Sequence, residues 1–175
     1  MILKGFKEKS NKKHLNKLLS ERQLQTTNSK VERLGVVFYA DGIIDLEWFK
    51  TLADSIKVMP KDLKIIAFSK NEKEILDTWD YCYTSQDFGW SGRIKNTELQ
   101  AFLNTEFDVL ISYYDKDFLE LKLITAKSKA KFKIGILQND ERLNDLIIKT
   151  NLKAFDLFKT ETFKYLKILN KIKNE

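Results

Sequence analysis

The sequence has few of the residues that usually carry catalytic and metal chemistry. Cys82 is the only cysteine and His14 the only histidine among 175 residues. A lone cysteine excludes an intramolecular disulfide, which favours a reducing compartment. One Cys and one His, far apart in the chain, cannot supply the ligands of a zinc site. Because His14 lies in the N-terminal arm, a histidine-based catalytic triad in the rest of the chain is excluded as well.

Glycine, proline and long apolar runs are also scarce. The six glycines have neither the spacing of a dinucleotide-binding loop nor that of a P-loop. No apolar run approaches the ~20 residues that a membrane span needs. Lysines interrupt the first residues, so we expect no secretory signal. These absences predict a cytoplasmic protein with no membrane span, no metal and no cofactor.

The net charge is concentrated at one end of the chain. The formal net charge is +6, and residues 1–30 hold eight basic but only two acidic residues, so the remainder is balanced. Residues 4–23 favour a helix because they are rich in Lys, Leu, Glu and Gln. Leu15, Leu18 and Leu19 share one face of this helix. The basic side chains expected to contact phosphate groups are Lys4, Lys7, Lys9, Lys12, Lys13, Lys17 and Arg22.

The rest of the chain alternates short apolar runs with helical periodicity. Buried strands are predicted at residues 34–40, 63–68, 107–113 and 132–137, with a further edge strand at 154–158. Helices are predicted at 45–57, 96–104, 118–128, 142–149 and 161–173. This alternation indicates an α/β fold. We expect a mostly parallel, doubly wound, Rossmann- or flavodoxin-like sheet of four to five strands, preceded by the basic N-terminal helix. Residues 1–30 would form the arm and linker, and residues 31–175 a single domain.

Polar residues follow the predicted strands. In an open parallel sheet, ligands bind beyond the carboxyl ends of the strands. If the protein is an enzyme, these side chains should therefore converge on one pocket for a small molecule or nucleotide. The residues concerned are Asp41, Ser69, Ser112, Tyr113 and Asp115.

Residues 79–92 depart from the alternation because five of these 14 residues are aromatic. Gly89 and Gly92 are turn signals within this aromatic segment, which predicts an extended excursion or a hairpin. We expect Trp79, Tyr81, Phe88 and Trp90 to be largely buried against the edge of the sheet, since aromatic side chains have a large area to hide.

A second basic cluster enters the last of the four apolar strands. Lys127, Lys129 and Lys131 occupy alternate positions there and could extend a phosphate-binding surface. The main hypothesis is an RNA-binding or ribosome-associated accessory protein, favoured by the charge of the arm and the missing catalytic groups. One alternative is a protein-interaction module that docks through the arm or the aromatic segment. The other is a small-molecule or nucleotide-binding enzyme that uses the strand ends, and the sequence does not decide whether the protein is an enzyme.

Three blocks of the sequence are distinctive: residues 87–92 (DFGWSG), 107–112 (FDVLIS) and 126–135 (AKSKAKFKIG). In these blocks the chain resembles an uncharacterised family of small α/β proteins from Bacteroidota. The resemblance spans most of residues 30–170 and implies a cytoplasmic bacterial protein. The family has no assigned activity, so the resemblance transfers no functional residue and does not choose between an enzyme and a binding protein.

Overall fold

A computed structural model describes the chain except for residues 26, 41, 43, 73–80 and 175. Six parallel strands form one open sheet in the order β3-β2-β1-β4-β5-β6. The register places Leu34 of β1 beside Leu63 of β2 and Val109 of β4. The strands are β1 (Leu34–Tyr39), β2 (Leu63–Phe68), β3 (Cys82–Tyr83), β4 (Val109–Tyr113), β5 (Phe132–Gly135) and β6 (Leu146–Ile147).

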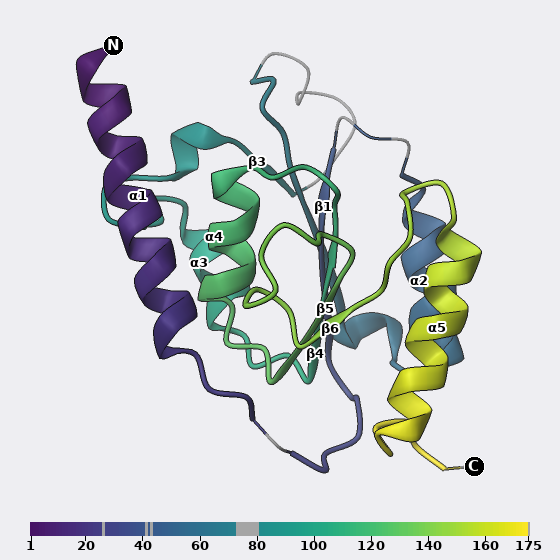
Figure 1. The fold of residues 1–175 in the computed structure, drawn as a ribbon. Helices are drawn as coiled ribbons and strands as arrows, with labels where there is room; N and C mark the ends of the chain where they lie inside the picture. Colours follow the sequence, from purple (N-terminus) through teal and green to yellow (C-terminus); the bar gives the residue numbers. More distant parts are fainter. Residues whose placement is uncertain (26, 41, 43, 73–80, 175) are drawn as a thin grey trace.

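Helices cover both faces of the sheet (Figure 1). One face carries α2 (Leu46–Ser55) and α5 (Phe155–Ile168), and the other carries α3 (Thr97–Asn104) and α4 (Leu119–Lys127). The first helix, α1 (Ile2–Glu21), lies outside α3 and α4 and forms a further layer on that side. Short 3-10 helices span Pro60–Asp62 and Ser85–Asp87. No helix among the described residues is long and apolar enough to cross a membrane.

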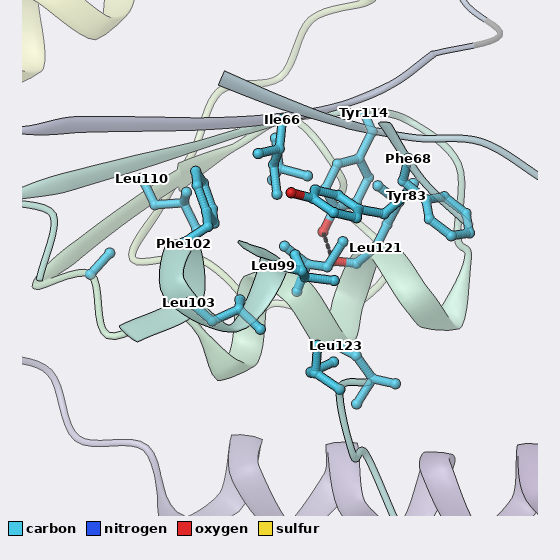
Figure 2. Close-up of a cluster of buried hydrophobic side chains, with 14 of the residues drawn as sticks. Ile66, Phe68, Tyr83, Leu99, Phe102, Leu103, Leu110, Tyr114, Leu121 and Leu123 are labelled. Carbon is cyan, nitrogen blue, oxygen red and sulfur yellow. Dashed lines mark hydrogen bonds between the residues drawn. The ribbon is translucent and has the colours of Figure 1, made fainter. Parts of the chain in front are cut away.

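Each face of the sheet has its own hydrophobic cluster. Figure 2 shows the cluster under α3 and α4, where Leu110 of β4 lies beside Phe102 of α3, and Tyr114 donates a hydrogen bond to the Leu121 carbonyl of α4. Tyr113 of β4 points into the other cluster and packs on Phe155 and Phe158 of α5. Every residue of β4 is buried, because helices cover both of its faces. The continuous apolar runs of the sequence thus correspond to the central strands.

The predicted fold class is confirmed, although the sheet has six strands instead of four to five, because the two-residue strands β3 and β6 were not predicted. Two local predictions are wrong. Residues 154–158 do not form an edge strand but begin α5, because Phe155, Phe158, Thr162 and Leu166 recur at helical spacing and are buried. Residues 142–149 form turns and β6 instead of a helix. The reason is tertiary: the Asp145 backbone N–H donates to the Lys133 carbonyl, and the Lys133 backbone N–H donates to the Asp145 carboxylate. These bonds hold the segment along β5.

Candidate nucleic-acid interface

The basic helix α1 is fixed to the body through its middle turns. Leu15 and Leu19 are each 4% exposed and join the cluster under α3 and α4. Asn11 is also buried, and its side-chain amide donates to the Gly89 carbonyl at 3.0 Å while its Oδ1 accepts from the Gly92 N–H at 2.8 Å. A buried amide that is satisfied on both sides favours one register of the helix on the turn. The helix therefore lies across the body in a fixed orientation.

The turn that receives Asn11 depends on Gly92. This residue has a φ of 70°, in the left-handed region that glycine adopts without strain. A Cβ atom at Gly92 would lie 2.1 Å from Cδ2 of His14, so the two segments meet here without room for any side chain. The Ser91 N–H donates to the Ser10 hydroxyl beside this contact. Close approach of α1 thus requires glycine at this position.

The carboxyl end of α1 is held by an ion pair that removes Arg22 from the predicted phosphate-binding set. The Arg22 guanidinium lies 2.5 Å from the Asp145 carboxylate, and only 17% of its side chain is exposed. It faces the body instead of solvent, because a buried carboxylate requires a partner charge. No sequence pattern indicates this role, since the partner lies more than 120 residues away in the chain.

Three lysines of α1 form an exposed stripe. Lys9, Lys13 and Lys17 recur every four residues, are exposed, and have no ion-pair partner among the described residues. Lys12 is exposed but pairs with Glu8 at 2.7 Å. Lys4 is exposed near the start of the helix, and Lys7 is half-buried. We call Lys9, Lys13 and Lys17 the lysine stripe.

The body adds further cations beside α1. The Lys127 ammonium, at the end of α4, lies 3.4 Å from Nε2 of His14. Lys127 and the exposed Arg93 line one shallow depression of about 410 Å³ together with Leu18 of α1. Lys129 is exposed just beyond α4. The basic residues of α1 and the second basic cluster, at residues 127–131, therefore lie next to each other along one side of α1.

Lys131 has a structural partner. Its ammonium donates to the Asp108 carboxylate at 2.8 Å, and the other oxygen of Asp108 accepts from the backbone N–H groups of Glu32 and Arg33. Burial alone would raise the pKa of Asp108, but the ammonium and the two N–H donors outweigh it and lower that pKa. Lys131 therefore anchors the chain that enters β1 and is not a free phosphate contact.

His14 contributes no charge of its own to this surface at neutral pH. Burial lowers the pKa of its imidazole, the Lys127 and Lys17 ammonium groups lower it further, and Glu21 partly offsets them. Because its ordinary pKa is already below 7, His14 is neutral there. The positive charge of the surface thus comes from the lysines and Arg93.

The four strand-end residues that the structure describes do not meet in one pocket. Ser112 is buried and bonds to Thr125 of α4, whereas Tyr113 points to the opposite face and donates to the Leu152 carbonyl. Successive side chains of a strand point to opposite faces, which is why neighbours at a strand end cannot both line one site. Ser69 is buried and Asp115 exposed. Asp41 lies outside the described residues.

A cavity of about 630 Å³ lies between the first half of α1 and the carboxyl edge of the sheet. None of the four described strand-end residues lines it. Its charges largely cancel in pairs, with Lys122 next to Asp117 and Lys70 next to Glu120. In the described part of the chain, no three His, Cys, Asp or Glu side chains gather as a metal site would require. The cavity therefore presents no single charge that would select a ligand.

The aromatic segment is only partly buried. Phe88 is 1% exposed and packs on Phe68, as predicted. Tyr81 and Trp90 are 54% and 49% exposed, so the prediction is wrong for these two, and Trp79 lies outside the described residues. Trp90 is turned outward because the next residues of its turn, Ser91 and Gly92, bond to α1. An exposed indole therefore stands next to the contact between this turn and the basic helix.

A family match spans most of the chain. The sequence model of a family of unknown function, DUF6913, matches residues 7–169, which include most of α1 and all six strands. The match confirms the expected relation to an uncharacterised family. No curated protein and no solved structure matches the chain. The chain therefore belongs to the DUF6913 family of unknown function.

Proposed function

We propose that this protein binds RNA through the outer face of α1, as an RNA-binding or ribosome-associated accessory protein. One observation carries the proposal: the lysine stripe is exposed on a helix whose opposite side is buried, beside Arg93, Lys127 and Lys129 of the body. Phosphate groups that line up with such cations release their condensed counterions, which drives binding without base recognition. The buried Asn11 and leucines hold the cations in place before binding, so less ordering is needed when RNA arrives.

Trp90 favours a single-stranded partner over a duplex. Exposed indole rings stack on unpaired bases, whereas bases within a duplex are already stacked. Its turn is bonded directly to α1 through Ser10 and Asn11, so the position of Trp90 is fixed relative to the helix that carries the lysine stripe. The combination of a cationic track and a stacking ring is typical of proteins that bind single strands without sequence preference.

The first prediction concerns the lysine stripe. Replacing Lys9, Lys13 and Lys17 together by Gln should weaken binding of unrelated single-stranded RNAs to a similar extent, because phosphate contacts carry no base information. The slope of log affinity on log salt should become shallower by about 2, at roughly 0.7 for each phosphate that is no longer neutralised. Fluorescence anisotropy with two unrelated labelled RNAs at several salt concentrations measures both effects.

A matched control removes three lysines from the opposite side of the molecule. Lys153, Lys164 and Lys167 are exposed at or near α5, so their replacement by Gln changes the net charge equally. The control variant should keep nearly the wild-type affinity and slope. Equal weakening by both triple variants would show a non-specific charge effect and contradict the proposal. Deleting α1 is no substitute, because it would expose Leu15, Leu19 and their partners in the core.

The second prediction concerns Trp90. The Trp90→Ala variant should bind single-stranded RNA more weakly by about 1–3 kcal/mol, the usual value of one stacked base, and duplex RNA almost unchanged. Trp48, which stacks on Phe155 on the other side of the sheet, provides the control as Trp48→Phe. If Trp90→Ala leaves both affinities unchanged, the indole is not part of the interface.

A further inference from the structure

Lys133 is a buried lysine inside a strand. Its residue is 2% exposed, and the ammonium nitrogen donates to the Ala126 carbonyl at the end of α4, at 3.3 Å. Lysine is almost never fully buried without a charged partner, because desolvation of the ammonium is costly. Lys133 is therefore an unusual residue for a buried position in this sheet.

The carboxylate that neighbours Lys133, that of Asp145, is already engaged. Asp145 accepts from Arg22 and from the backbone N–H of Lys133, and no ion pair joins the Lys133 ammonium to a carboxylate among the described residues. Burial and, to a smaller extent, the Arg22 guanidinium lower the pKa of Lys133 to about 7, although Asp145 partly opposes them. A large fraction of this amine is therefore uncharged at neutral pH, with its lone pair available.

Lys133 borders a cavity. A space of about 530 Å³ lies beneath the end of α1, at the amino edge of the sheet, and Lys133 lines it together with Arg22, Lys129 and Lys131. Two carboxylates, Glu21 and Glu106, also line it, and both residues are exposed. Arg22 and Lys131 are paired with aspartates, which leaves Lys129 as an exposed cation without an ion-pair partner in the described residues. Small anionic molecules match this arrangement of one nucleophilic amine and a neighbouring ammonium group.

We propose that Lys133 is a reactive amine that forms an imine with small carbonyl compounds bearing a carboxylate, held in this cavity with the carboxylate towards Lys129. The amine lone pair attacks the carbonyl carbon, and the C=O electron pair moves to oxygen, which takes up a proton. The nitrogen of the resulting carbinolamine loses its extra proton to water. Departure of the hydroxyl group as water then leaves a C=N bond, so that aldehyde and amine give imine and one water. This site shares Lys129 with the border of the proposed RNA surface, but it does not use the lysine stripe on the outer side of α1.

The test uses glyoxylate as the probe and sodium cyanoborohydride to trap the imine in the full-length protein. Labelled lysines are identified and quantified by peptide mass spectrometry at a series of pH values. Lys133 should be the most rapidly labelled lysine near neutral pH, and its labelling rate should rise with a midpoint near pH 7 as the amine loses its proton. Labelling of Lys133 that is absent, or no faster than that of the exposed Lys153, would overturn the proposal.

Two variants separate reactivity from a structural role as the cap of α4. Arg22→Gln removes the neighbouring cation and should move the labelling midpoint of Lys133 to higher pH, with slower labelling at pH 7. Arg142→Gln, in which an exposed guanidinium paired with Asp140 is removed, should leave the midpoint in place. An unchanged midpoint in Arg22→Gln would contradict the proposed influence of that cation on the amine. Because no RNA is present, failure of this experiment leaves the RNA-binding proposal untouched, and failure of RNA binding leaves this one untouched.

Discussion

Gly92→Ala is expected to destabilise the protein by about 2–5 kcal/mol, from two separate causes. A left-handed backbone conformation costs a residue with a Cβ atom roughly 1–2 kcal/mol. The new methyl group would also lie 2.1 Å from the His14 ring, so the ring or the whole of α1 must move, and such overpacking costs about 1–3 kcal/mol. Urea denaturation followed by circular dichroism measures the total.

Two further variants, one a control and one a double variant, test the two causes of this effect. Gly89→Ala lies in the same turn, but the atom nearest to its Cβ would be the Arg93 Cβ, at 3.3 Å, so a small effect is expected. In the double variant His14→Ala/Gly92→Ala the clash is removed and only the backbone strain remains. The double variant should therefore be more stable than the sum of the two single changes predicts. Strict additivity would show that α1 does not press against this turn.

Docking of α1 links this prediction to RNA binding. The lysine stripe owes its orientation to the contact of Asn11 and His14 with the turn at residues 89–92. Displacing the helix should therefore lower RNA affinity even though Gly92→Ala removes no charge. Normal RNA affinity in a destabilised Gly92→Ala protein would mean that the helix binds RNA without needing its fixed place on the body.

Lys133→Met is expected to change the pH dependence of stability by a few kcal/mol. In the folded protein the pKa of Lys133 is lowered from its ordinary value of 10.5 to about 7. Between these values the unfolded chain binds more protons than the folded one, so this lysine makes stability rise as pH rises. The variant lacks this contribution, and the difference between the two stability curves isolates it.

The size of the effect depends on pH. At pH 6 the Lys133 side chain is charged, and burying the ammonium destabilises the folded protein. Its hydrogen bond to the Ala126 carbonyl stabilises the folded protein by only about 1 kcal/mol, the value of a typical hydrogen bond, which does not offset the desolvation. Lys133→Met should therefore be the more stable protein there, and its advantage should shrink steadily towards pH 10. Lys164→Met is the control: its hydrogen bond and ion pair with Glu161 raise the pKa of Lys164, so this lysine contributes no such slope below pH 10. If the free energy of unfolding of wild type and of Lys133→Met changes with pH in the same way, the lowered pKa of Lys133 in the folded protein is contradicted.

Much of the fold was predictable from the amino-acid pattern because the central strands carry their own signal. Residues 34–39, 63–68 and 109–113 are mostly apolar without alternation, which indicates strands covered on both faces. The lysine stripe was predictable too, because helical spacing alone places Lys9, Lys13 and Lys17 together. Short or ambiguous elements were not, since an apolar run such as 154–158 fits a strand or a helix until its packing is known.

The class of fold, the concentration of positive charge on the first helix and the scarcity of catalytic groups thus follow from the amino-acid sequence alone. Which cations are free depends instead on the three-dimensional packing, because Arg22 and Lys131 meet their aspartates across loops of the chain. The same packing makes Ser112 and Tyr113 face opposite layers, exposes Trp90 and places Lys133 beside a cavity. The physical reason is common to all of these features. A side chain's charge state and accessibility depend on the groups packed around it, and those groups come from distant parts of the sequence.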